Sequence, residues 1–199
     1  MNIDTLRQKK HWLFDMDGTL THAIHDFEAI KAELKLPAGK PILESIAKLP
    51  EKEAAMVNQR LDALEYDIAA QATAHPHSEA LLRGLKNAGC KVGIVTRNGH
   101  GIAMATLKAC KLDTYFSENA VISRDCCEPK PSPAGIELLL ARWSATSNTA
   151  VMVGDYLFDL EAGQRAGVST VHLDTSGQYN WPEHTDFGID SLQPLARLF

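Results

Sequence analysis

Short runs of apolar residues alternate with longer stretches of helical spacing along most of the chain. Runs of this length suit strands buried on both faces of a sheet, and the stretches between them suit helices that cover those faces. Strands that alternate with helices in this way usually form a parallel sheet. We therefore predict an α/β fold with a five-stranded parallel sheet. The predicted strands are residues 12–15, 91–96, 120–123, 150–155 and 170–174, and the predicted helices that accompany them are residues 78–87, 100–111, 133–143, 157–166 and 191–198.

Residues 21–74 break this alternation, because they contain helical patterns and no convincing strand. Within them, residues 51–73 carry apolar side chains at spacings of three and four residues, as an amphipathic helix does. The charges between these apolar positions are predicted to form the solvated face of that helix. They are Arg60, Asp62, Glu65 and Asp67. We predict a core domain of residues 1–20 and 75–199, into which residues 21–74 are inserted as an all-helical domain.

His75 and His77 flank Pro76 where the sheet pattern returns. Two histidines beside a proline do not make a metal site unless further ligands lie nearby. We interpret both as hinge residues with no chemical role.

The charge balance argues against some partners. The 199 residues include 25 Asp and Glu against 20 Lys and Arg, which gives a net charge of −5, the wrong sign for holding nucleic-acid phosphates. No apolar run reaches the roughly 18 residues that cross a bilayer, and the charged start of the chain does not resemble a signal peptide. The four cysteines lack the spacing of a disulfide scaffold or a zinc site. We expect a cytoplasmic protein that binds neither nucleic acid nor membranes; the sequence does not indicate its oligomeric state.

Two acidic residues stand at the end of the first predicted strand, where the sequence reads DMDGT. Parallel sheets bind ligands at the carboxyl ends of their strands. Asp15 and Asp17 repel each other unless a cation or a shared proton compensates, so the pair indicates a metal site or an acid and base pair. Gly18 after them allows a sharp turn whose backbone N–H groups can cradle a phosphate.

Three further loops at this edge carry groups of related chemistry. Thr96 ends the second strand just before Arg97, and its hydroxyl and the following N–H groups suit phosphate oxygens. Lys130 stands between two prolines that stiffen its loop. Asp155 ends the fourth strand, and Asp159 follows on the same face of the next helix. This second acidic pair offers the hard oxygen ligands that a divalent cation prefers.

In this order, DMDGT, the Thr after the second strand, the Lys of PKPSP and GDYLFD resemble the motifs of the haloacid dehalogenase-like hydrolase superfamily. The helical insertion resembles the small cap of the branch that includes phosphoglycolate phosphatases and beta-phosphoglucomutases. The resemblance implies a three-layer, Rossmann-like core with this cap over the carboxyl edge of its sheet. It also implies a Mg²⁺-dependent phosphatase that acts on a small phosphorylated metabolite.

The resemblance further implies a role for each matching residue. Asp15 would be the nucleophile that forms an aspartyl-phosphate, and Asp17 would be the general acid and base. Mg²⁺ would bind the Asp15 carboxylate, the Asp17 backbone carbonyl and Asp155. Thr96 and Lys130 would hold the transferring phosphoryl group. In addition, Asp159 would orient Lys130 or a metal-bound water.

Two places depart from the usual pattern of this family and bear on the substrate. Arg97 stands where relatives often carry a small residue or Asn, and His22 and His25 lie in a segment that often carries Asp. We predict that Arg97, together with His22 or His25, contacts an anionic leaving group. The alternative is that the histidines are exposed positions on a helix at the entry to the cap.

Two other functions stay open. A phosphomutase of the beta-phosphoglucomutase kind would use the same residues but protect the aspartyl-phosphate from water. A non-catalytic binding protein would keep the fold without turnover, although the intact set of Asp15, Asp17, Lys130 and Asp155 favours an enzyme.

Overall fold

Six parallel strands form one sheet in the computed structural model, which describes residues 2–24 and 26–199. Their order is β3-β2-β1-β4-β5-β6, and every pairing is parallel. The strands are β1 (His11–Phe14), β2 (Lys91–Val95), β3 (Val121–Ile122), β4 (Ala150–Gly154), β5 (Ser169–Leu173) and β6 (Phe187–Ile189). The predicted α/β class is confirmed, whereas the predicted number of five strands is one too few.

The additional strand is β6, which pairs with β5 at the edge of the sheet, where Phe187 lies opposite Val171. It has three residues, and its central Gly188 is exposed between two buried neighbours. A run this short, interrupted by glycine, is too weak a sequence signal for a strand. The pairing with β5 is what makes this segment a strand.

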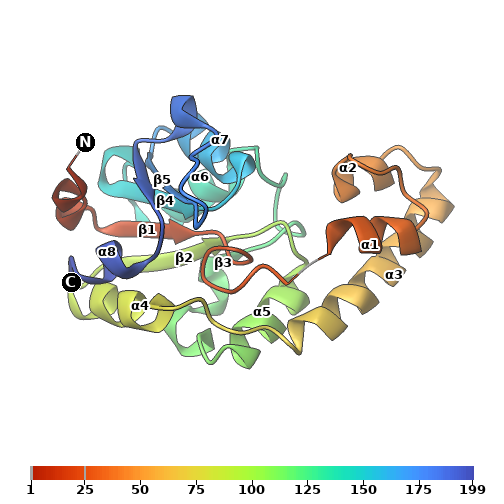
Figure 1. Ribbon diagram of the computed structural model, residues 1–199, viewed down its shortest axis with the longest axis horizontal. Helices are drawn as coiled ribbons and strands as arrows, with labels where there is room; N and C mark the ends of the chain where they lie inside the picture. The colour runs from red at the N-terminus through yellow and green to blue at the C-terminus, as the bar shows by residue number, and fades with distance from the viewer. Residues whose placement is uncertain (1, 25) are drawn as a thin grey trace.

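Helices cover both faces of the sheet, as Figure 1 shows. They are α4 (Ser78–Asn87), α5 (His100–Ala109), α6 (Ala134–Trp143), α7 (Leu157–Arg165) and α8 (Gln193–Ala196), with short 3₁₀ helices at Ile3–Gln8, Asp113–Tyr115, Glu118–Ala120, Ser147–Thr149 and Pro182–His184. In β1, Trp12 and Phe14 pack in the cluster that includes α4 and α5, and Leu13 packs in the cluster that includes α6 and α7. Alternate residues of a strand point to opposite faces, so the side chains of β1 contribute to the core on both sides of the sheet.

The chain between β1 and α4 is helical and has its own apolar cluster. Its helices are α1 (Phe27–Glu33), α2 (Ile42–Ile46) and α3 (Glu51–Ala69). Leu61 of α3 packs there with Ile30 and Leu34. In Figure 1 these helices lie together beside the end of the sheet toward which β1 points. Helix α3 ends four residues before the predicted residue 73, because the chain turns back there toward the sheet.

The two segments that lead into and out of these helices are bonded to each other. Thr21 and Ala74 form an antiparallel bridge, and the N–H of His22 donates to the carbonyl of Thr73 at 3.0 Å. The helical insertion therefore joins the core through a paired connection. Among the described residues, no helix combines the length and the apolar character needed to cross a bilayer.

Candidate active site

Three carboxylates meet at the carboxyl edge of the sheet. Asp15 follows β1, Asp155 follows β4, and Asp159 lies in the first turn of α7. One carboxylate oxygen of each lies within 4.8 Å of the others. Since β1 and β4 are neighbours in the sheet, their parallel pairing delivers two of these side chains to one place.

Lys130 lies among these acids, although its side chain is only 2% exposed. Its Nζ lies 2.5 Å from Asp15 Oδ1 and 2.6 Å from Asp159 Oδ1. Burial alone would lower the pKa of Lys130, but the charges of Asp15 and Asp159 outweigh it and raise that pKa. Lys130 therefore stays an ammonium ion. Asp159 also accepts the backbone N–H of Tyr156 at 3.0 Å, which caps α7 and fixes the carboxylate.

Two glycines make room for this cluster. A Cβ at Gly18 would lie 2.3 Å from Asp155 Oδ2, and the φ of Gly18 is +88°, in the region that favours glycine. A Cβ at Gly154 would lie 2.4 Å from Asp159 Oδ2. At both positions the backbone lies so close to an aspartate side chain that only glycine fits without a shift.

Asp17 points to a different set of partners from Asp15. Its Oδ2 accepts the side-chain amide of Asn98 at 2.7 Å, and its Oδ1 lies 3.4 Å from the hydroxyl of Thr21. Burial raises the pKa of Asp17, while the hydrogen bonds from Asn98 and Thr21 oppose this rise. A carboxyl with a raised pKa is suited to exchange a proton near neutral pH.

The charge of the cluster fits a divalent cation. Burial raises the pKa of Asp15, and Lys130 opposes the rise. Burial, together with the charges of Asp15 and Asp159, raises the pKa of Asp155 to about 8, and burial raises that of Asp159 to about 6. The Lys130 ammonium balances one of the three carboxylates, so two negative charges remain when all three are ionised. Hard carboxylate oxygens at this spacing are the donors that Mg²⁺ takes in proteins.

Thr96 follows β2, next to β1, and is buried. Its hydroxyl accepts the backbone N–H of Asn98 at 3.1 Å. This places the Thr96 side chain on the same edge as Asp15, as the sequence predicted for a strand end.

The guanidinium of Arg97 is held by other residues of the protein. Its guanidinium makes two 2.8 Å contacts to the carboxylate of Glu44 in α2, and it donates to the backbone carbonyl of Lys130. The guanidinium also lies 4.8 Å from the centre of the Phe158 ring. Arg97 thus links the helical insertion to the loop of the buried lysine.

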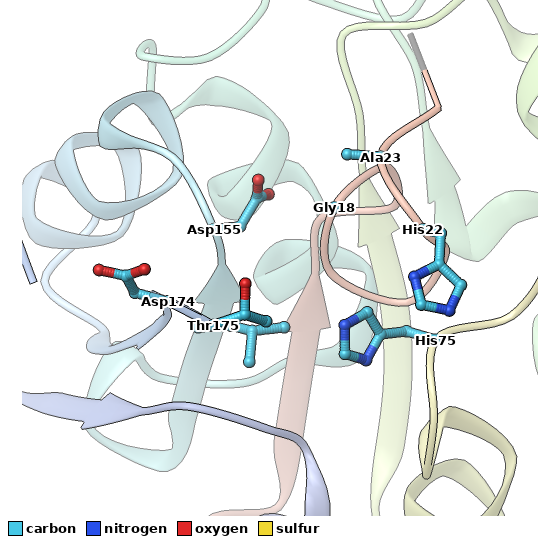
Figure 2. Close-up of a pocket in the computed structure, with 8 residues that line it drawn as sticks. Gly18, His22, Ala23, His75, Asp155, Asp174 and Thr175 are labelled. Carbon is cyan, nitrogen blue, oxygen red and sulfur yellow. The ribbon is translucent and has the colours of Figure 1, made fainter. Parts of the chain in front are cut away.

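Of the two predicted histidines, His25 lies outside the described residues. His22 lines a cavity of about 320 Å³ together with His75, Gly18 and Asp155. The rings of His22 and His75 lie 4.8 Å apart, and Figure 2 shows them on one side of the cavity, with Asp155 and Asp174 on the other. His75, interpreted from the sequence as a hinge residue, therefore also borders the site. Burial lowers the pKa of His75.

The sequence prediction of a fully solvated face on α3 is wrong. Glu65 is buried, and its carboxylate binds Arg124 at 2.9 Å and 3.2 Å, while Asp62 binds the same guanidinium at 2.7 Å. Arg124 comes from the loop after β3, so these ion pairs join the insertion to the core. Helical periodicity could not show that this face meets a charged side chain 59 residues away.

Sequence reasoning also missed Asn98, Glu44 and Arg124. Asn98 stands beside a predicted residue, but its contact with Asp17 depends on which strands are neighbours. Glu44 and Arg124 belong to no recognisable motif, and a single charged residue is most often exposed to solvent, so nothing in the sequence distinguishes them.

Comparison with known proteins agrees with this geometry. A family model described as haloacid dehalogenase-like hydrolase matches residues 12–173. This chain belongs to the haloacid dehalogenase-like hydrolase family. A member of the family from Arabidopsis thaliana, a haloacid dehalogenase-like hydrolase domain-containing protein, is 31% identical over 204 aligned positions, which cover 92% of this chain and 76% of the relative.

Two further relatives of this hydrolase have names that specify an activity. The pyrophosphatase PpaX of Listeria innocua is 28% identical over 216 aligned positions and covers 94% of each chain. A crystal structure of a predicted phosphoglycolate phosphatase from Haemophilus somnus has a TM-score of 0.78 at 21% identity and covers 96% of this chain and 98% of that chain. The predicted family and hydrolase class are confirmed, and the structural match shows the same fold.

Proposed function

We propose that this hydrolase is a Mg²⁺-dependent phosphatase that removes phosphate from a small phosphorylated metabolite in the cytoplasm. The observation that carries the proposal is the buried Lys130 ammonium, held 2.5 Å from Asp15 and 2.6 Å from Asp159, with Asp155 beside them. A structural ion pair would not need a third carboxylate beside it. An excess of negative charge at a sheet edge is instead suited to a divalent cation and an anionic substrate.

Asp15 is the nucleophile in this proposal. One of its carboxylate oxygens forms a bond to phosphorus as the bond from phosphorus to the leaving oxygen breaks. Asp17 gives its proton to that oxygen, so the leaving group departs as a neutral hydroxyl. Water then attacks the phosphorus of the aspartyl-phosphate, its proton passes to Asp17, and the bond from phosphorus to Asp15 breaks. Inorganic phosphate is released, and both aspartates return to their starting states.

Other residues hold the charged groups. Asp15, the backbone carbonyl of Asp17, and Asp155 would bind Mg²⁺, which when bound neutralises the repulsion between a carboxylate nucleophile and a phosphate anion. Lys130 and Thr96 hold the phosphoryl oxygens. Two further assignments complete this set: backbone N–H groups at Gly18 contact the phosphate, and Asp159 keeps Lys130 in place.

We also propose that residues 21–74 form a cap domain over this site, inserted into a core of residues 1–20 and 75–199. The proposal that Arg97 contacts an anionic leaving group requires that anion to displace Glu44, which holds the guanidinium. His22, and by proximity His75, would border the bound substrate.

Release of inorganic phosphate from a panel of phosphorylated metabolites tests the proposal. We expect turnover with Mg²⁺, loss of turnover with EDTA, and loss in Asp15→Asn, which keeps the shape of the side chain but not the nucleophile. Asp67→Asn, an exposed change on α3, is the matched control and should behave like the wild type. An isomeric sugar phosphate formed in place of free phosphate would indicate a phosphomutase. A folded, Mg²⁺-loaded protein without turnover of any ester would overturn the proposal.

A further inference from the structure

Asn98 reaches Asp17 from the loop after β2. Its Nδ2 lies 2.7 Å from Asp17 Oδ2, across a sequence separation of 81 residues. This is the length of a hydrogen bond to a charged acceptor. The amide nitrogen can only donate, so Oδ2 is the acceptor in this contact.

The backbone of Asn98 is anchored on both sides. Its N–H donates to Thr96 Oγ1 at 3.1 Å, and its carbonyl accepts the N–H of Arg124 at 3.1 Å. The guanidinium of Arg124 also donates to the carbonyl of Arg97 at 3.2 Å, and it is itself held by the buried Glu65. The loop after β2, the loop after β3 and α3 therefore fix the position of the Asn98 amide, and the amide in turn limits how the Asp17 side chain rotates.

This contact distinguishes the two oxygens of Asp17. A proton on Oδ2 would face the N–H donor of Asn98, and two donors repel each other. A proton on Oδ1 meets the hydroxyl of Thr21 at 3.4 Å, which is able to donate or accept. The hydrogen bond from Asn98 thus favours the form in which Oδ1 carries the proton.

We infer that Asn98 is a positioning residue that orients the Asp17 carboxyl, so that Oδ1 gives its proton to the leaving oxygen and takes one from water. The inference rests on the proposed acid and base role of Asp17. It adds that the efficiency of this role depends on an amide from a different strand.

The dependence of rate on the leaving group tests the inference. A good leaving group such as 4-nitrophenolate departs without a proton, whereas an alkoxide needs one. The value of kcat/KM reports the steps up to formation of the aspartyl-phosphate, so it isolates the proton given to the leaving oxygen. The wild type, Asn98→Ala, Asn98→Asp, Asp17→Asn and Asn87→Ala would be compared with Mg²⁺ on 4-nitrophenyl phosphate, phenyl phosphate and an alkyl phosphate.

In Asn98→Ala we expect kcat/KM to fall about tenfold or more for the alkyl ester relative to the 4-nitrophenyl ester, because a displaced acid loses part of its contribution. Asn98→Asp keeps the shape without the donor and should show the same selective loss. In Asp17→Asn, kcat/KM should depend most strongly on the leaving group. Asn87→Ala, an exposed change at the end of α4, should match the wild type.

Suppose that kcat/KM of Asp17→Asn depends steeply on the leaving group. The inference is then overturned if, in both Asn98 variants, kcat/KM changes equally for the three esters or does not change. If Asp17→Asn itself shows no such dependence, the proposed role of Asp17 fails instead. Thermal melting of each variant identifies one that has not folded. Should Asn98→Ala not fold, the isosteric Asn98→Asp decides the outcome; should both fail to fold, Asn98 would be a structural residue and the inference would be wrong.

Discussion

Replacement of Lys130 by Met would remove an ammonium group from among buried carboxylates while keeping most of the length of the side chain. In the wild type, Nζ lies 2.5 Å from Asp15 and 2.6 Å from Asp159, and each contact corresponds to about 6 to 7 kcal/mol of Coulomb attraction at an effective dielectric constant of about 20. Desolvation of the three charges offsets much of this. Removal of one partner from a buried ion pair typically costs about 3–5 kcal/mol, because the remaining charges lose their compensation. We expect Lys130→Met to lose stability in that range at pH 8 without Mg²⁺.

Urea unfolding in EDTA measures this loss, with Lys48→Met as the matched control. Lys48 is exposed, so its replacement should change the free energy of unfolding by no more than about 0.5 kcal/mol. The deficit of Lys130→Met should shrink at pH 5.5, where protonation of Asp155 and Asp159 removes charge from the cluster. The deficit should also shrink with Mg²⁺, because the cation supplies the positive charge that Lys130→Met lacks and so stabilises the variant more than the wild type.

A free energy of unfolding for Lys130→Met equal to that of the wild type at pH 8 in EDTA would refute this reasoning. It would mean that the three carboxylates need no compensating charge, and the argument for a cation at this site would fail with it. An equal deficit at pH 5.5 and pH 8 would show instead that the lost stability comes from packing.

Three further outcomes follow from the same geometry. Asp17→Asn should lower kcat roughly 100-fold while Mg²⁺ binding measured by calorimetry stays intact, because the backbone carbonyl is the proposed ligand; full activity would exclude the acid and base role. Glu44→Gln should lower KM severalfold for a substrate with an anionic leaving group, and not for one with a neutral group, because it frees Arg97; equal effects on both would argue against contact with that anion. In EDTA, the wild-type protein should lose stability as the pH rises from about 4 through about 6 to about 8, because burial raises the folded-state pKa of Asp159 and Asp155 above that of the unfolded chain; a stability that rises over this range in urea titrations would contradict the buried cluster.

Much of the fold was predictable because its signals are local. The buried strand that precedes Asp15 is a continuous apolar run. Helices such as α4 can be recognised from the spacing of their apolar residues and from the residue types at their two ends. The strand predicted at residues 120–123 is present as the two-residue β3, whereas the three-residue β6 is too short for its pattern to be read. β6 was missed because its pairing partner, not its composition, makes it a strand.

The candidate site divides in the same way. Asp15 and Asp155 were predictable because each stands at the end of a strong strand signal, and parallel strands bring their carboxyl ends to one edge. The partners of Arg97 were not predictable, since Glu44 comes from a separate helix whose orientation depends on how the insertion packs. The burial of Glu65 against Arg124 has the same origin.

The amino-acid sequence by itself determined which acids, which lysine and which hydroxyl follow the strands, in the loops and first helical turns beyond them, because strand and loop propensities act over a few neighbouring residues. Tertiary structure alone decided which of these groups touch. Lys130 between two aspartates, Asn98 on Asp17, and Arg97 bound by Glu44 all join residues far apart in the chain. Such contacts depend on strand order and on the docking of the insertion, which many residues set together and no short stretch encodes.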